Sequence, residues 1–239
     1  MTTLFISDLH LSQARPHINE IFLRFLSGRA RQAESLYILG DLFEVWLGDD
    51  MILPDYQPGI DGLRNLSESG TAVYVMYGNR DFLMRDHFET LTGATIIHEP
   101  YIVELNGVKT LLLHGDTLCT DDLEYQKFRA MVRNPQWQDE LLAKTPEERL
   151  ALARQFREIS KTETAQKASE IMDVNQAAVE KVLQEHQVTQ LVHGHTHRPA
   201  IHEFTLNGTA AKRIVLADWY DKGSCLVFDG NGHHTEELA

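Results

Sequence analysis

The stretch that decides the fold is Leu4-Phe5-Ile6-Ser7-Asp8-Leu9-His10, where an apolar run ends in two side chains that bind metals. The same pattern recurs four times along the chain, with apolar runs followed by Gly40-Asp41, Gly78-Asn79-Arg80-Asp81, His114-Gly115-Asp116 and Gly194-His195-Thr196-His197. An apolar run of this kind predicts a buried strand. Strand ends converge at one edge of a sheet, and open α/β sheets bind ligands there. We therefore expect these polar segments to meet at one edge of a sheet.

Side chains with oxygen or imidazole donors would meet at this site. The candidate ligands are Asp8, His10, Asp41, Asn79, His114, His195 and His197. Taken singly, each has an ordinary explanation, because Gly-Asp and Asn are common in turns and a histidine after three leucines suits a core. Such accidents explain poorly why all of them follow strands in this order. Together they are about what two octahedral metal ions need when water and substrate fill the remaining positions.

Length and charge limit the classes of function. The chain has 239 residues, which suits one large domain or a domain with an insertion. Its net charge of −13 argues against a nucleic-acid binder with a broad basic surface. The charge does not exclude an anionic substrate, because divalent ions reverse the field around them.

Cysteine use and hydropathy bear on the compartment. Cys119 and Cys225 are not in a CxxC pair, and we expect two reduced thiols. No basic and apolar leader precedes the first strand, and no apolar run approaches the ~20 residues that cross a bilayer. The expectation is a protein that stays in the cytoplasm, with a contact to a membrane surface left open.

Residues 2 to about 117 alternate strands and helices, an order that indicates a sheet covered by helices. The expected strands are 2–7, 35–40, 72–77, 101–105 and 108–113, and the expected helices are 16–31, 59–69 and 84–91. Strands return at 189–193, 200–206, 212–217 and 224–229. Asn106-Gly107 and Asn207-Gly208 predict two hairpins.

Residues 121–187 differ from the rest because strand signals stop and apolar residues recur at helical spacing. This segment lies between two ligand-bearing strands, so it is predicted to be an insertion within a domain. Its apolar stripe either packs on the main sheet, as most such stripes do, or lines a slot for acyl chains. The candidates for the slot are Phe128, Met131, Trp137, Leu141, Leu142, Leu152 and Phe156. The residues alone leave both readings open.

As a set, the motifs D-x-H, G-D, G-N-R-D, H-G-D and G-H-T-H resemble those of the calcineurin-like metallophosphoesterases, from residue 8 to residue 197. Longer stretches resemble the branch of that family that hydrolyses UDP-2,3-diacylglucosamine in the lipid A biosynthesis of Gram-negative bacteria. These stretches are residues 7–11 (SDLHL), 39–44 (LGDLFE), 114–122 (HGDTLCTDD), 171–175 (IMDVN) and 193–199 (HGHTHRP).

The resemblance implies a fold and a metal centre. The fold is α/β (α+β), a four-layer metallophosphoesterase β-sandwich flanked by helices, formed as a single domain by residues 1–239. Residues 121–187 become a helical lid over the lipid. Two Mn²⁺ ions per chain are implied, and Asp41 bridges them. One ion has Asp8, His10, Asp41 and His197 as ligands, and the other has Asp41, Asn79, His114 and His195. A pair bridged in this way lies roughly 3.5–4 Å apart and lowers the pKa of a bridging water.

The implied reaction is attack of water on the α-phosphorus of UDP-2,3-diacylglucosamine, which gives UMP and 2,3-diacylglucosamine 1-phosphate. The implied enzyme is a peripheral membrane protein at the cytoplasmic face of the inner membrane. It binds no nucleic acid and needs no obligate protein partner. Two alternatives remain: another dimetal phosphoesterase that acts on a soluble nucleotide or phosphodiester, and a binding protein that keeps the fold as a scaffold. Scaffold proteins of this kind lose ligands, and this chain retains all seven.

Arg80 departs from the pattern of many family members, which carry histidine after the Asn of this motif. A guanidinium group stays protonated and cannot act as a general acid, but it clamps phosphate oxygens with two parallel hydrogen bonds. An arginine in place of a histidine suits a reaction in which the leaving group is itself a phosphate, because such a group needs no proton donor. Arg80 therefore favours pyrophosphate cleavage over cleavage of a phosphomonoester or simple diester.

The resemblance also assigns residues to catalysis and to the substrate. Catalytic roles fall to Asn79, Arg80 and His195, and substrate contacts to Asn79, Arg80, Asp122, Ser160, Thr164, Lys167 and His195. Thr164 is a second departure, because relatives carry Asn there. The basic residues of the insertion are expected either to face anionic lipid or to form a solvated helix face. They are Lys127, Arg129, Arg133, Arg149, Arg154 and Arg157.

Overall fold

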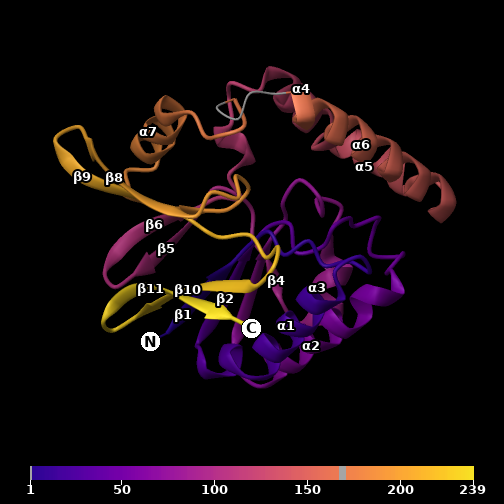
Figure 1. Ribbon diagram of the computed structural model, residues 1–239, viewed down its shortest axis with the longest axis horizontal. Helices are drawn as coiled ribbons and strands as arrows, with labels where there is room; N and C mark the ends of the chain where they lie inside the picture. Colours follow the sequence, from indigo (N-terminus) through magenta and orange to yellow (C-terminus); the bar gives the residue numbers. More distant parts are fainter. Residues whose placement is uncertain (1, 167–170) are drawn as a thin grey trace.

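The computed structural model describes residues 2–166 and 171–239, and shows two sheets packed face to face with helices on both outer sides (Figure 1). Helices α1 (Pro16–Ser27), α2 (Gln57–Glu68) and α3 (Asp86–Thr92) cover the first sheet. Helix α7 (Gln176–Glu185) covers the second. The order helix, sheet, sheet, helix gives the four layers that were predicted.

The first sheet has six strands in the order β11-β10-β1-β2-β3-β4. Their bounds are β1 (Thr3–Ile6), β2 (Ser35–Leu39), β3 (Ala72–Met76), β4 (Thr95–Ile96), β10 (Gly223–Asp229) and β11 (Gly232–Leu238). Strands β1 to β4 run parallel, with Phe5 opposite Tyr37, whereas β10 pairs antiparallel with β1 and with β11. The carboxyl ends of β1, β2 and β3, which lead to predicted ligands, therefore lie at the same edge of this sheet.

The second sheet has five strands in the order β5-β6-β7-β9-β8. Their bounds are β5 (Tyr101–Leu105), β6 (Val108–Leu112), β7 (Gln190–His193), β8 (Ala200–Leu206) and β9 (Thr209–Val215). The central strands β6, β7 and β9 are parallel, and the two predicted Asn-Gly hairpins supply the antiparallel edge strands β5 and β8.

Alternation along the strands divides the core into layers. In β1, Leu4 and Ile6 face the helices, whereas Phe5 faces the other sheet and stacks on Tyr37 at 5.1 Å between ring centroids. Successive side chains of a strand point to opposite faces, so a continuous apolar run fits a strand that is buried on both sides. Val179 and Leu183 of α7 cover the outer face of the second sheet. The two cysteines are buried free thiols.

The predicted elements are present, with differences that have local causes. The helix expected over 16–31 ends at Ser27, and a 3₁₀ turn, Arg29–Gln32, follows Gly28. Strand β11 was not predicted because its sequence is polar: it pairs only with β10 and lies at the sheet edge. Strand β4 was missed because it has two residues.

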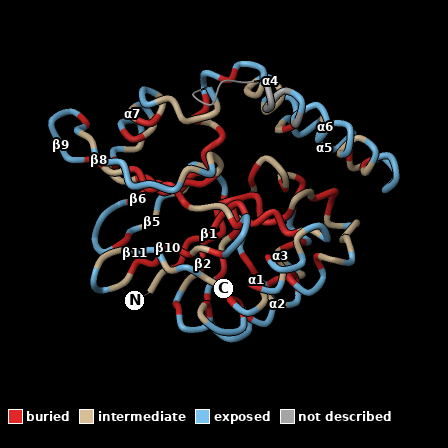
Figure 2. Tube along the Cα trace, in the orientation of Figure 1, coloured by how far each residue is buried: buried red, intermediate tan, exposed pale blue. Residues whose placement is uncertain are grey.

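Helices α4 (Leu123–Val132), α5 (Pro135–Leu142) and α6 (Pro146–Gln166) follow the sandwich strand β6. Figure 1 shows α5 and α6 extending beyond the sandwich, whereas α7 packs on it, and Figure 2 shows that α6 is largely exposed along its outer side. Pro135 and Pro146 each begin a helix, where the missing N–H costs nothing. Among the described residues, no helix is long and apolar enough to span a bilayer.

Candidate metal centre and substrate cavity

The predicted ligands come from strand ends of both sheets. Strands β1, β2 and β3 of the first sheet lead into Asp8 and His10, Asp41, and Asn79. Strands β6 and β7 of the second sheet lead into His114 and into His195 with His197. The expectation of a single sheet edge was wrong in this respect. The site lies where the carboxyl ends of parallel strands from two stacked sheets meet, which brings donors to it from two sides.

The backbone turns sharply at the predicted ligands. Five of them have a left-handed backbone: Asp8 (φ 56°), His10 (φ 48°), Asp41 (φ 52°), His195 (φ 68°) and His197 (φ 54°). Among non-glycine residues, Asp and His are tolerated comparatively well in that region. Strained backbone of this kind gathers at functional sites, where the surrounding structure holds it in place.

Two glycines allow the ligand loops to approach each other. A Cβ on Gly78 would lie 2.1 Å from Asp41 Oδ1, and a Cβ on Gly194 would lie 2.3 Å from Asp8 Oδ2. A side chain at either position would displace Asp41 or Asp8, so glycine is favoured at both. This is a physical reason for the glycines of the G-N-R-D and G-H-T-H motifs.

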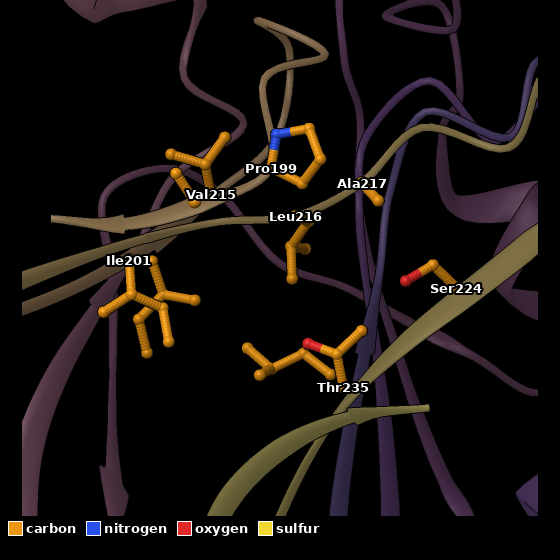
Figure 3. Close-up of a pocket in the computed structure, with 10 residues that line it drawn as sticks. Pro199, Ile201, Val215, Leu216, Ala217, Ser224 and Thr235 are labelled. Carbon is orange, nitrogen blue, oxygen red and sulfur yellow. The ribbon is translucent and has the colours of Figure 1, made fainter. Parts of the chain in front are cut away.

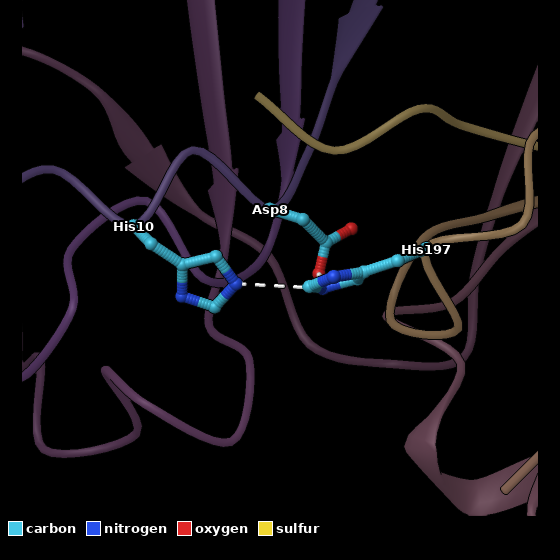
Figure 4. Close-up of side chains that lie close together, drawn as sticks. All are labelled: Asp8, His10 and His197. Carbon is cyan, nitrogen blue, oxygen red and sulfur yellow. Dashed lines mark hydrogen bonds and ion pairs between the residues drawn. The ribbon is translucent and has the colours of Figure 1, made fainter. Parts of the chain in front are cut away.

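One group of donors gathers around Asp8. His10 Nε2 lies 3.4 Å from His197 Nε2, and His197 Nε2 lies 3.4 Å from Asp8 Oδ1 (Figure 4). Asp41 Oδ2 lies 3.8 Å from His10 Nε2. Two imidazole nitrogens that face each other at this distance share at most one proton, and both face carboxylates. The arrangement suits a cation between them.

The second group gathers around Asn79. Asn79 Oδ1 lies 3.1 Å from His114 Nε2 and 3.0 Å from His195 Nδ1. Asp41 Oδ1 lies 3.9 Å from His114 Nε2, so the two oxygens of Asp41 face different groups. Asp41 therefore has the position of a bridging carboxylate.

The donor set fits divalent metal ions. Asp8 Oδ1 is buried and accepts no hydrogen bond from any described residue. His114 Nδ1 lies 2.8 Å from the carbonyl oxygen of Leu39, which holds a proton on Nδ1 and makes Nε2 the nitrogen that faces the site and would bind a metal ion once deprotonated. Mixed nitrogen and oxygen donors without thiolate suit hard to borderline ions. Clusters of this kind are present at Asp8, His10 and His197 and at Asp8, Asp41 and His114.

Without metal, protons would balance the charge in the cluster. Burial opposes the charged form of His114, but Asp41, Asp116 and Asp8 outweigh it and raise the pKa of His114 to about 9. Burial raises the pKa of Asp41 to about 7. Burial lowers the pKa of His195 to about 4, which keeps that imidazole neutral. The site thus carries enough negative charge to hold cations.

Other carboxylates hold the ligand loops in place, and sequence reasoning did not find them. Asp81 is fully buried and accepts N–H groups from Gly78 at 2.7 Å and Leu42 at 2.8 Å. Asp218 Oδ2 lies 3.3 Å from His197 Nδ1. Asp81 follows Asn79-Arg80 directly, which was a usable signal, but Asp218 follows no motif.

A buried ion network joins α4 to the site. Asp116 Oδ2 accepts hydrogen bonds from Tyr125 Oη and Arg129 Nε, both at 2.8 Å. Arg129 also pairs with Glu99, and Glu99 Oε2 accepts the backbone N–H of His114 at 3.0 Å. Helix α4 is therefore fixed to the loop that carries a predicted ligand.

The expectation that the basic residues of the insertion face lipid or solvent was wrong for three of them. Arg129 pairs with Asp116, and Arg133 donates to the carbonyl oxygen of Gly78 at 2.8 Å. Arg149 is buried. Their guanidinium groups face carboxylates and carbonyls inside the protein, which a helix sequence read alone does not reveal.

The family follows from comparison with known proteins. Residues 1–199 match a family model described as calcineurin-like phosphoesterase. The chain belongs to the calcineurin-like phosphoesterase family. The predicted family and fold class are thereby confirmed.

Relatives of this phosphoesterase are similar over nearly their whole length. UDP-2,3-diacylglucosamine hydrolase of Chromohalobacter salexigens is 52% identical over 219 residues, which cover 92% of this chain and 89% of the relative. The protein of that name from Azotobacter vinelandii is 49% identical over 237 residues, 98% of this chain and 97% of the relative. The one from Pseudomonas putida KT2440 is 50% identical over 232 residues, 96% and 95% of the two chains.

Next to the metal centre, this phosphoesterase has a cavity of about 770 Å³ between the strand-end loops and helices α4 to α6. Its walls are mainly apolar, and six of the seven residues proposed for an acyl slot line it. They are Phe128, Met131, Trp137, Leu141, Leu152 and Phe156. Leu142 does not line it and packs against the core of the first sheet. The cavity supports the slot reading of the insertion.

Predicted substrate contacts lie at the same cavity. Asn79, Arg80, Asp122 and Ser160 line it, and His195 lies against Asn79. Asp122 also caps α4, because its Oδ1 accepts the N–H of Tyr125 at 3.1 Å. The Thr164 side chain and Lys167 lie outside the described residues. The structure therefore joins four of the expected contacts to the metal centre through one cavity.

A second, smaller cavity of about 170 Å³ lies elsewhere, between β8, β9 and β10 (Figure 3). Pro199, Ile201, Leu216 and Thr235 are among the residues that line it. Its described lining contains no charged side chain and no predicted ligand. It offers no chemistry for a phosphoryl substrate.

Proposed function

We propose that this phosphoesterase hydrolyses the pyrophosphate bond of UDP-2,3-diacylglucosamine, releasing UMP and 2,3-diacylglucosamine 1-phosphate, a step of lipid A biosynthesis. Relatives about half identical over nearly the full chain are named for that substrate. One structural observation carries the proposal: a two-metal donor set opens directly into an apolar cavity large enough for acyl chains. A soluble nucleotide or simple phosphodiester would leave that apolar surface without a function.

The metal ligands in this proposal are those predicted. Asp8, His10, Asp41 and His197 would hold one ion, and Asp41, Asn79, His114 and His195 the other. Bound metal ions would supply a water of lowered pKa and bind phosphate oxygens. We propose Mn²⁺, two per chain, because the donors mix nitrogen with oxygen.

Arg80 gives the site its preference for a phosphate leaving group. Its guanidinium lies at the junction of the metal centre and the cavity, where it can donate two parallel hydrogen bonds to phosphate oxygens. It supplies charge without giving up a proton. His195 is neutral at pH 7, so it is not a proton donor either. An arginine in place of a general acid fits a leaving group that is already a weak base.

The cavity positions the lipid part of the substrate. Phe128 and Phe156 meet edge to face at 5.4 Å between ring centroids, and Trp137 lies 6.2 Å from Phe156. These rings form an apolar wall that would hold acyl chains and exclude water from the reacting phosphates. Ser160, Asp122 and, in this proposal, Thr164 and Lys167 contact the polar part of the substrate.

The location of the enzyme is part of the proposal. We place it as a peripheral protein on the cytoplasmic face of the inner membrane, as a single domain whose helices within residues 121–187 act as a lid. Leu123, Met131 and Ile159 of α4 and α6 are exposed, and a substrate with acyl chains resides in a bilayer. A net charge of −13 fits the absence of a nucleic-acid partner, and we propose no obligate protein partner.

A substrate panel with Mn²⁺ tests the proposal. The panel contains a diacylated UDP-glucosamine, its deacylated form and an aryl phosphodiester, each assayed with the wild type, Asp41→Ala and His114→Ala. We expect fast release of UMP from the diacylated compound alone, and loss of it in both variants. His202→Ala, a change of a histidine on β8 away from the site, serves as the matched control. Equal turnover of the three compounds would contradict the lipid substrate, and near-normal activity of either variant would contradict the site.

A further inference from the structure

Glu44 lies in the loop after β2, three residues beyond Asp41, and its side chain is only 17% exposed. Two groups approach Glu44 Oε2: His10 Nδ1 at 3.6 Å and Arg15 Nη2 at 3.7 Å. On the other oxygen, Arg80 Nη1 lies 3.9 Å away and Arg157 Nη1 of α6 makes direct contact. A single carboxylate thus meets one predicted metal ligand and three guanidinium groups.

The contact with His10 places the Glu44 carboxylate on the side of the imidazole ring that faces away from the metal centre. His10 Nε2 faces His197 and Asp41 at the metal centre, so Nδ1 is the nitrogen that points away from it. Nδ1 is buried and makes no hydrogen bond with any described residue, and Glu44 is the carboxylate on that side. A histidine that binds a metal through one nitrogen donates its other N–H to an acceptor, often a carboxylate.

The contacts with the arginines gather positive charge at the junction with the cavity. Arg15 is held independently, because it donates to the carbonyl oxygens of His10 at 2.8 Å and Trp219 at 3.1 Å. Arg80 and Arg157 lack such anchors for the guanidinium groups within the described part of the chain: the only carboxylate within 4 Å of either is Glu44. Without it, three cations would repel one another before any phosphate arrives.

We propose that Glu44 is a positioning residue that aligns His10 for metal binding and holds Arg80 and Arg157 at the phosphate end of the cavity. Through Arg157 it also fastens helix α6 to the metal centre. This inference rests on the metal site of the proposed function and adds a residue that none of the predicted roles includes. Glu44 acts through other groups and does not itself react.

The test measures metal binding without substrate. Metal-free full-length protein is titrated with Mn²⁺ by calorimetry, for the wild type, Glu44→Gln and Arg157→Gln. Glutamine keeps the shape and one acceptor oxygen of Glu44 but loses its charge, and we expect loss of the charged outer acceptor to weaken metal affinity about 10-fold, the low end of the range for such partners. Arg157→Gln should leave the affinity within about twofold, because Arg157 does not contact a ligand. Glu147→Gln, at an exposed carboxylate of α6, is the matched control.

A second readout follows α6. Hydrogen exchange of residues 150–160 in the metal-free protein should rise to the same extent in Glu44→Gln and in Arg157→Gln. The double variant should show no further rise, because each single substitution weakens the same Glu44–Arg157 ion pair. Wild-type Mn²⁺ affinity in Glu44→Gln, or additive exchange in the double variant, would overturn this inference alone. A wild-type chain that binds no Mn²⁺ would defeat the proposed function together with it.

Discussion

We expect the buried Arg149 side chain to contribute more to the free energy of unfolding than its ion-pair partner Asp50 does. The substitution Arg149→Met tests this expectation. All five N–H groups of its guanidinium are bonded, and the residue is 5% exposed. Three go to the carbonyl oxygens of Leu47 at 2.9 Å, Leu142 at 2.7 Å and Lys144 at 3.0 Å. The other two go to Asp50, which joins the start of α6 to the loop after β2.

The magnitude follows from the surroundings of each acceptor. Leu47 is buried, so its carbonyl would lose a partner that water does not readily replace, at a cost of about 1–3 kcal/mol. Lys144 is exposed and Leu142 is half-buried, so water can reach their carbonyls and less than about 1 kcal/mol is lost at each. Asp50 is 62% exposed, and a pair with so open a carboxylate is worth at most about 1 kcal/mol. We expect Arg149→Met to lower the free energy of unfolding by about 3 kcal/mol.

The assay is urea denaturation followed by tryptophan fluorescence, with Asp50→Asn as the matched variant. Asp50→Asn removes the ion pair but leaves the three carbonyl bonds, so it should cost less than about 1 kcal/mol. Equal costs for the two variants would show that the ion pair, and not the carbonyl bonds, carries the stability. A cost below about 1 kcal/mol for Arg149→Met would refute the reasoning altogether.

Three further predictions concern the site. Arg80→Lys keeps the charge but loses the two-pronged donor, so kcat/KM for the diacylated substrate should fall roughly 10²-fold, and unchanged steady-state kinetics would exclude the phosphate clamp. Mn²⁺ binding at pH 7.5 should release about two protons, because metal ions bind neutral imidazole and two of the predicted ligands are protonated at that pH. Burial opposes the charged form of both imidazoles, but nearby aspartates outweigh it. They raise the pKa of His114 to about 9 and the pKa of His197 to about 10. Affinity should then increase as pH rises toward 9; calorimetry in buffers of different ionisation enthalpy measures the protons, and uptake of protons would have the wrong sign. Tyr125→Phe removes the hydroxyl that donates a hydrogen bond to Asp116, so it should lower the free energy of unfolding by about 1–2 kcal/mol, measured by urea denaturation. An unchanged free energy of unfolding would contradict this.

The sequence allowed the strands and the gathering of the donor side chains at their ends to be predicted, because both follow from local patterns. Leu4-Phe5-Ile6 is apolar throughout, as a strand buried on both faces requires, and Asp8 and His10 follow it directly. Asn106-Gly107 and Asn207-Gly208 have the left-handed backbone of hairpin turns. Local sequence patterns determine where a strand or a turn forms, but they do not determine which of the two sheets a strand joins.

Partners that lie far apart along the chain could not be predicted. Arg129 meets Asp116 from 13 residues away, and Arg149 meets Asp50 from 99 residues away. On a helix sequence such arginines look like surface cations. Glu44 and Asp218 were missed for the same reason, since each acquires its role only when loops from different strands meet.

The left-handed backbone at five of the predicted metal ligands has a consequence for the stability of this chain. A left-handed backbone costs about 1–2 kcal/mol of conformational free energy at each such position, and glycine would remove that cost. At Asp8 or His197 the backbone therefore favours glycine, which has no side chain to bind a metal ion. Variants selected only for heat resistance would therefore drift toward loss of the ligands.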